Sequence, residues 1–217
     1  MGFEVSQILN ILKEILHEIE KENPYKLIGK GGTILSLYYL NHRDSEDLDF
    51  DTTFSKEKSK QIQKYILNIL DNLKTRGILK GYKLTKGVLA STNRYHMNLV
   101  LYTHKDLLTK IDIDFVKPVK NLNKKGEFFY YSLERLFIGK LITFNRRKEF
   151  KDIYDISYIL SKIKTDSFSG NLRVVELIDN TINNLEMEDI FNLYKKAFRN
   201  RDMKFKDFKS AQLGAFR

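Results

Sequence analysis

The feature that most constrains the fold is a strict alternation of acidic and apolar residues at positions 47–51. Side chains alternate between the two faces of a β-strand, so the pattern predicts a strand with its carboxylates on one face. Asp47 and Asp49 then lie close together, and two such charges repel each other unless a cation lies between them. Asp51 continues the alternation and can equally be a plain surface residue.

A second acidic strand is predicted at residues 110–115, where Asp112 and Asp114 again share one face. If this strand pairs with the first, three carboxylates can serve one metal centre, an arrangement used for metal-assisted phosphoryl transfer. Carboxylate oxygens suit Mg²⁺ or Mn²⁺. The alternative is a half-buried strand with a solvated acidic face. The candidate metal ligands are Asp47, Asp49, Asp112 and Asp114.

A glycine-rich turn precedes the first acidic strand. Residues 25–28 are short and apolar, Gly31, Gly32 and Thr33 follow, and residues 34–40 are apolar again. This order predicts a strand, a turn and a helix. Backbone N–H groups and the positive end of such a helix bind phosphate, so the turn is a candidate cradle for a nucleoside triphosphate.

Two polar residues lie between the turn and the acidic strand. Arg43 can clamp phosphate charge with its planar guanidinium group. Ser45, two residues before Asp47, can contact a metal ion or a phosphate. Each of them can also be an ordinary polar loop residue.

The rest of the chain changes from a mixed pattern to a helical one. The polar, basic stretch at 117–127 is the best candidate boundary, so we expect an α+β domain at 1–127 and an all-α domain at 128–217. Apolar spacing predicts helices and strands on either side of it. The expected helices lie at 5–19, 56–74, 132–144, 150–163, 172–183 and 187–198, and the expected strands at 82–84, 95–102 and 110–116.

Lys140 stands out in the helical half because it lies inside an apolar stripe. A lysine there must reach solvent, form an ion pair or face a ligand. Asp152 and Asp155 follow at helical spacing, with basic residues nearby such as Arg147. These residues either close a nucleotide site from the second domain or serve an ordinary capped helix.

Composition narrows the choice of partners. Cysteine is absent, which excludes disulfides and thiolate sites, and the formal net charge of +10 favours polyanions such as nucleic acid. A basic–aromatic stretch at 199–209 is a candidate RNA-contact surface or simply a packed helix. No apolar run is long enough to span a bilayer and the first residues do not resemble a signal peptide, so we expect a cytoplasmic protein that avoids membranes.

Together these motifs resemble the signature of the AbiEii/AbiGii nucleotidyltransferases, the toxins of abortive-infection and related toxin–antitoxin systems. The resemblance rests on GGTIL at 31–35, RDSEDLDF at 43–50, KIDI at 110–113 and KDIYD at 151–155, in that order. It implies a polymerase-β-like nucleotidyltransferase core, a mixed sheet flanked by helices, followed by a helical-bundle domain. It also implies transfer of a nucleoside monophosphate from an NTP, with the 3′ end of tRNA as acceptor and an antitoxin as partner.

The resemblance further implies a role for each site residue. Asp47 and Asp49 would hold the metal, and Asp112 would complete the site and act as the base. Lys140 would bind the nucleotide, and Asp155 or Asp152 would be the closing carboxylate. The phosphate-binding set would be Gly31, Gly32, Thr33, Arg43 and Ser45. Two alternatives stay open, a nucleotidyltransferase acting on a small molecule or protein, and a catalytically inactive nucleic-acid-binding relative.

Overall fold

The protein is described here from a computed structural model. The structure describes residues 2–40, 45–90, 93–163, 172–183, 185–186, 188–190 and 192–193. The chain divides into two compact units, Met1–Ser132 and Leu133–Arg217. Arg43 and the basic–aromatic stretch at 199–209 lie outside the described residues, as does most of the helix expected at 187–198.

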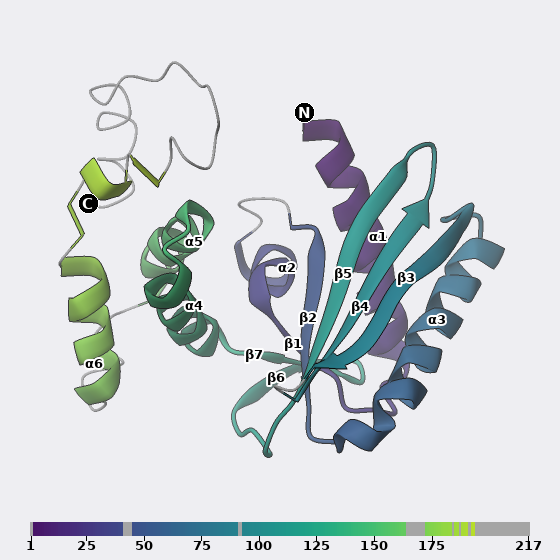
Figure 1. The fold of residues 1–217 in the computed structure, drawn as a ribbon. Coiled ribbons are helices and arrows are strands. Elements are labelled where there is room, and N and C mark those ends of the chain that lie inside the picture. Colours follow the sequence, from purple (N-terminus) through teal and green to yellow (C-terminus); the bar gives the residue numbers. More distant parts are fainter. Residues whose placement is uncertain are drawn as a thin grey trace. The chain divides into compact units, whose positions relative to one another are not determined.

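The first unit is built on a seven-stranded mixed sheet in the order β3-β4-β5-β2-β1-β7-β6 (Figure 1). Strand β2 pairs in parallel with β5, and β1 pairs in parallel with β7, while the other neighbours are antiparallel. The mixed α/β core expected from the sequence is confirmed. The strands are β1 (Ile28–Lys30), β2 (Asp47–Thr52), β3 (Gly81–Ala90), β4 (Arg94–Tyr102), β5 (Asp106–Phe115), β6 (Leu122–Lys125) and β7 (Phe128–Tyr131).

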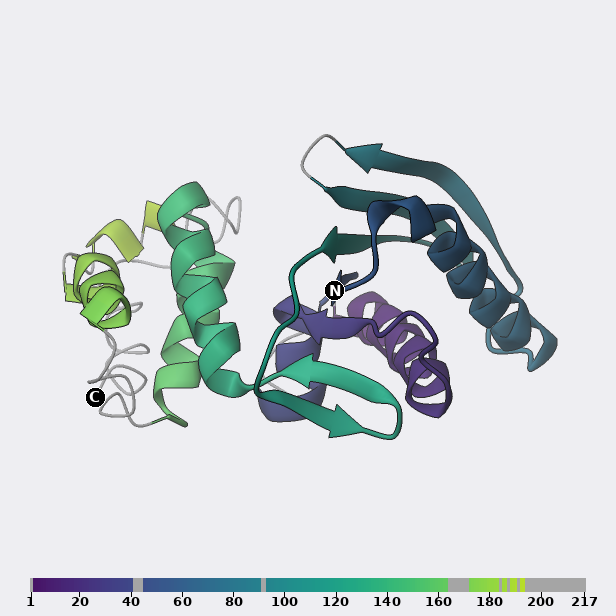
Figure 2. The ribbon, with the colours of Figure 1, turned by 90° about the horizontal axis from the view of Figure 1, so that it is seen from below.

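Two amphipathic helices cover one face of this sheet, α1 (Gly2–Lys21) and α3 (Ser59–Thr75), which contact each other (Figure 2). Their apolar residues recur at helical spacing and are buried, as Leu12 and Ile66 illustrate. The short helix α2 (Gly31–Leu35) follows β1, continues as η1 (Ser36–Leu40) and buries Ile34. A short 3-10 turn, η2 (Lys56–Lys58), precedes α3.

The sheet extends further along the chain than the sequence suggests. Part of the expected linker at 117–127 forms β6, which turns back as β7 beside β1. Phe128 and Tyr131 are buried there, so this apolar stretch belongs to the sheet and not to the helical half. The division between the units therefore falls after Ser132, later than the boundary expected at 127.

The described elements of the second unit are all helical. They are α4 (Leu133–Arg147), α5 (Phe150–Leu160), α6 (Leu172–Ile178) and η4 (Asp179–Asn183). Helices α4 and α5 pack on each other and bury Phe137, Phe144 and Ile156. None of the helices in the described part of the chain has the length and apolarity needed to cross a membrane.

Candidate active site

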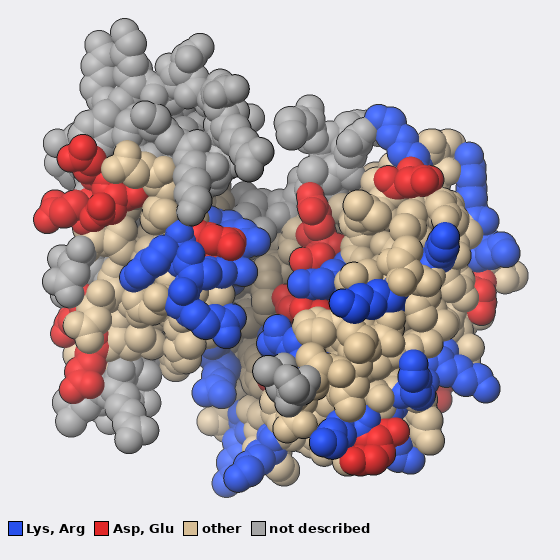
Figure 3. Space-filling view, viewed as in Figure 1, with Lys and Arg blue, Asp and Glu red and all other residues tan. Residues whose placement is uncertain are grey.

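The two acidic strands lie side by side at the centre of the sheet. In the parallel pair β2–β5, Asp49 stands opposite Asp112, Asp51 opposite Asp114, and Asp47 opposite Lys110. Opposed residues of neighbouring strands point to the same face. Asp47, Asp49, Asp51, Asp112 and Asp114 therefore share the face opposite the buried Leu48 and Phe50, and Figure 3 shows acidic and basic groups together on the visible face of the first unit.

Two of these aspartates are neutralised within the first unit. Lys30, at the end of β1, pairs with Asp51 and with Asp114, the latter at 2.5 Å. Arg94 on β4 makes two further hydrogen bonds to Asp114, at 2.5 and 2.6 Å. The Tyr131 hydroxyl donates to Asp51. Burial opposes ionisation of Asp114, but the bonds from Arg94 and Lys30 outweigh it and hold its pKa below the usual range.

Asp47 and Asp49 differ from that pair because they have no hydrogen-bond or ion-pair partner among the described side chains. Burial raises the pKa of Asp49, and the neighbouring charge of Asp112 raises it further. A carboxylate in such surroundings is stabilised by added positive charge. These two oxygen donors therefore fit a hard divalent cation such as Mg²⁺ or Mn²⁺.

Asp112 is buried, with 3% of its surface exposed, and three basic groups lie within ion-pair distance of it, the farthest being the guanidinium of Arg94 at 3.9 Å. The Nδ1 atom of His96 lies 2.7 Å from one carboxylate oxygen, and the Nζ atom of Lys110 lies 3.2 Å from the other. Within the described ranges, no three acidic or histidine side chains stand close enough to enclose a metal ion. The register nevertheless favours Asp112 over Asp114 as the third carboxylate, because Asp112 is the one opposite Asp49.

The glycine turn lies against these carboxylates. Gly31 has φ +76°, and a Cβ atom at this position would collide with the carboxylate of Asp49. Only glycine meets both requirements without strain. The hydroxyl of the buried Thr33 donates to the backbone oxygen of Asp47, which fastens the start of α2 to β2. Thr33 is thus engaged with the backbone, while Gly31 and Gly32 are half-buried.

Ser45 lies two residues before the start of β2 and is half-buried. The strand start beside it is fixed by Thr109, whose hydroxyl donates to the backbone oxygen of Glu46 at 2.5 Å. Ser45 therefore lies next to the acidic pair, as the spacing to Asp47 requires.

The residues predicted in the second unit also contact one another. The Nζ atom of Lys140 lies 2.6 Å from Asp155 and 3.3 Å from Asp152, and both aspartates are fully buried. Arg147 makes two hydrogen bonds to Asp152, at 2.5 and 2.7 Å. Lys140 is therefore an ion-paired lysine of the α4–α5 pair, one of the alternatives that the sequence leaves open.

Three residues of the first site escape sequence reasoning, namely Lys30, Arg94 and His96. Each faces an aspartate from a neighbouring strand, so its role depends on the order and register of the sheet. A signal was present for Lys30, because a lysine at the end of an apolar strand next to paired carboxylates is a natural counter-ion. For the other two, the pairing of β4 with β5 had to be known.

Solved structures share this architecture. A putative nucleotidyltransferase from H. pylori covers 100% of this chain and 94% of its own length, at TM-score 0.68 and 18% identity. The structure of JHP933 from Helicobacter pylori covers 100% and 91%, at TM-score 0.61 and 18% identity. MenT4, a nucleotidyltransferase toxin from Mycobacterium tuberculosis, covers 87% and 71%, at TM-score 0.58 and 14% identity. At these identities the likeness establishes the fold.

The acidic residues beside a glycine turn on this sheet fit the nucleotidyltransferase class that the motifs predict. The sequence family described as nucleotidyl transferase AbiEii toxin, type IV toxin–antitoxin system, matches residues 25–213. The chain therefore belongs to the AbiEii family of nucleotidyltransferase toxins, as the motifs predict. No curated protein matches it.

Proposed function

We propose that this protein transfers a nucleoside monophosphate from an NTP to the 3′ hydroxyl of an RNA, most simply a tRNA, in a metal-dependent reaction. The observation that carries the proposal is the unpaired Asp47–Asp49 pair, which lies beside the glycine turn on a sheet face otherwise neutralised by Lys30 and Arg94. Asp47 and Asp49 would hold a Mg²⁺ or Mn²⁺ ion, which would supply positive charge for the phosphates and lower the pKa of the acceptor hydroxyl.

In this proposal the residues of the first unit divide the work. Asp47 and Asp49 hold the metal, and Asp112, on the neighbouring strand, takes the proton of the acceptor hydroxyl. The N–H groups of Gly31 and Gly32 bind the phosphates, with Ser45 and Arg43 beside them. Thr33 holds the glycine turn beside β2 through its hydrogen bond to the backbone oxygen of Asp47.

For the second unit we propose a helical bundle in which Lys140 binds the nucleotide. Asp152 and Asp155 hold its ammonium group in one orientation. The formal net charge of +10 supports a polyanionic acceptor. Membership of a type IV toxin–antitoxin family supports a cognate antitoxin as a further partner.

The direct test is labelling of total RNA with each radiolabelled NTP and Mg²⁺, compared between the wild type and Asp49→Asn. The matched control is Asp106→Asn, because Asp106 is an exposed acid on the same strand as Asp112. We expect labelled RNA with the wild type and the control, and none with Asp49→Asn. Label on a small molecule or a protein instead would overturn the RNA acceptor, and no label from any NTP would overturn the transfer reaction.

A further inference from the structure

The acidic site lies on a larger open face of the sheet. Along β4 the residues alternate strictly, with Tyr95, Met97, Leu99 and Leu101 buried and the residues between them half-exposed. The buried side faces α3, since Tyr82 of β3 donates to Asp71 at 2.9 Å and Tyr95 donates to Gln63. The residues that alternate with them therefore form the opposite, uncovered side of the strands.

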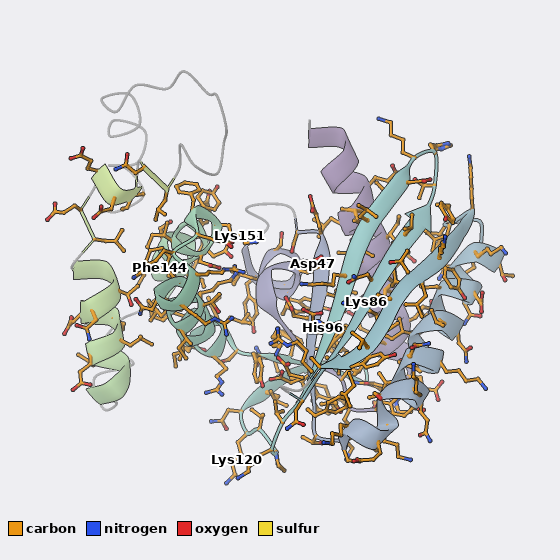
Figure 4. All side chains as sticks on the ribbon, viewed as in Figure 1. Asp47, Lys86, His96, Lys120, Phe144 and Lys151 are labelled. Carbon is orange, nitrogen blue, oxygen red and sulfur yellow. The ribbon has the colours of Figure 1, made fainter. Side chains whose placement is uncertain are left out.

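A strip of this open face leads directly to the acidic pair. It consists of the outward side of β4 from Tyr102 to His96, flanked by Lys83 and Lys86 on β3 and by Lys110 on β5; we call it the β4 strip. One row crosses four strands, because Lys86 is opposite Asn98, Asn98 opposite Lys110, and Lys110 opposite Asp47. In Figure 4, Lys86, His96 and Asp47 lie on this part of the sheet.

The lysines of the β4 strip are positively charged and accessible to a ligand. Lys83 and Lys86 are exposed and have no ion-pair partner in the part of the chain that the structure describes. Lys110 is 42% exposed although it contacts Asp112. Apolar surface lies between these cations, since Leu108 is 73% exposed and Val88 39%. Cations along an open sheet face with apolar and aromatic surface between them suit a nucleic-acid strand.

The order of the strands assigns this strip to the acceptor and not to the NTP. The glycine turn follows β1, on one side of the acidic pair, whereas β5 and β4 lie on the other side. An NTP on the glycine turn leaves the β4 side free. A strand lying along β4 would bring its end to Asp47 and Asp49 from the side opposite the triphosphate, as an in-line attack on phosphorus requires.

We propose that the β4 strip binds the single-stranded 3′ end of the acceptor RNA, with its phosphates on Lys83, Lys86 and Lys110 and an upstream base against Tyr102. The direction assigned to the RNA strand rests on the proposed function, whereas the binding of RNA to the β4 strip does not. From His96 to Tyr102 the strip is about 20 Å long at roughly 3.3 Å per residue, so it holds several nucleotides.

The first experiment measures binding of a single-stranded oligoribonucleotide, without NTP, across a salt series. Lys83→Gln/Lys86→Gln is compared with Lys64→Gln/Lys74→Gln, which removes the same charge from exposed positions on α3. We expect the strip variant to lower the salt slope by about 1.4, so that the fall in affinity between about 50 and about 200 mM salt shrinks about sevenfold. The α3 variant should behave as the wild type.

The second experiment tests the direction of the strand by transfer to acceptors of different length. Tyr102→Ala should reduce transfer to a long oligoribonucleotide several-fold and leave transfer to a dinucleotide unchanged, because the dinucleotide does not reach Tyr102. Tyr102→Phe keeps the ring and should behave as the wild type, and thermal unfolding checks that both variants are folded.

The outcomes separate the two proposals. Equal salt slopes for the strip variant and the α3 variant would overturn RNA binding by the β4 strip, even if transfer to RNA is observed. A loss of Tyr102→Ala activity that is independent of acceptor length would overturn the assigned direction. A lower salt slope in the strip variant alone, together with no labelling of RNA by the wild type, would support RNA binding by the β4 strip and overturn the proposed transfer reaction.

Discussion

Asp49 and Asp112 stand opposite each other in the parallel pair β2–β5, and burial and this neighbour together raise the pKa of Asp49. The two carboxylates belong to segments far apart in the sequence, and only their register brings them together. Asp112 is contacted by His96 and Lys110, whereas Asp49 has no such counter-ion in the described ranges. In the metal-free protein the fold therefore holds these two carboxylates close together although their charges repel each other.

Replacing Asp49 by Asn should abolish transfer and stabilise the metal-free protein. The variant removes a charge whose folded-state pKa is raised above the ordinary carboxyl value of 3.8. A raised carboxyl pKa destabilises the fold at pH values above the unfolded pKa, and this penalty disappears as the pH falls below it. The gain in melting temperature over the wild type should thus be largest near pH 7 and shrink towards pH 4, as measured by thermal unfolding in a chelator.

Adding Mg²⁺ to the same two proteins should reverse their order. The wild type gains stability by binding the ion, whereas Asp49→Asn has lost a ligand and gains little. Asp106→Asn serves as the control and should respond to Mg²⁺ as the wild type does. Equal stabilisation of the wild type and Asp49→Asn by Mg²⁺ would remove Asp49 from the metal site.

Gly31→Ala should cost activity, and Gly77→Ala provides a matched comparison. Both glycines have positive φ, +76° and +74°, so each substitution carries the same backbone strain of about 1 kcal/mol or more. A Cβ at Gly77 meets nothing within 4 Å, whereas one at Gly31 collides with Asp49. Similar melting temperatures with transfer lost only in Gly31→Ala would support the close approach. Full activity of Gly31→Ala would contradict it.

Lys30→Met should destabilise the first unit by about 3 kcal/mol or more, because it leaves buried carboxylates without their counter-ion. Lys30 pairs with both Asp51 and Asp114, and of these two aspartates Arg94 pairs with Asp114 alone. Adding Asp51→Asn to the variant should recover part of the loss, as denaturant unfolding of the single and double variants will show. If Lys30→Met is as stable as the wild type, the ion pairs of Lys30 make no net contribution to the free energy of unfolding.

Lys140→Met separates pairing from packing in the second unit. The apolar stripe alone suggests that methionine fits without loss of stability. The structure reverses that expectation, since Asp152 and Asp155 are fully buried and pair with Lys140. We expect a loss of about 3 kcal/mol, partly restored by adding Asp155→Asn. Thermal unfolding measures this, and nucleotide binding measured alongside tests the proposed phosphate contact.

Much of the fold follows from local pattern. The helices at 59–75 and 133–147 and the acidic strands at 47–52 and 106–115 are all marked by periodicity. The short strand expected at 25–28 lies instead at Ile28–Lys30, because Lys26 has φ +47° and the Asn23 side chain binds both backbone groups of Leu27. That turn depends on the hydrogen bonds of the Asn23 side chain, and such bonds cannot be predicted from the spacing of hydrophobic residues.

The site was predictable in its charges but not in its pairing. Sequence reasoning finds Asp112 and Asp114 equally suitable, because both alternate with apolar residues. They are distinguished by the pairing of the strands, because Asp112 stands opposite Asp49 whereas Asp114 receives the hydrogen bonds of Lys30 and Arg94 from other strands. Likewise, the apolar residues at 128–131 suggest the start of the helical half, but in the structure they form a strand that pairs with β1. Sheet order is a long-range property, and no window of sequence contains it.

The parallel pairing of β2 with β5 also sets when the enzyme can begin to act. A ribosome makes Asp49 well before Asp112, and α3, β3 and β4 must be synthesised before the two acidic strands can pair. Strand β7, which completes the sheet beside β1, is made later still. A nascent chain therefore carries the first acidic strand for some time without its partner. For a toxin, this delays activity until synthesis of the first unit is finished.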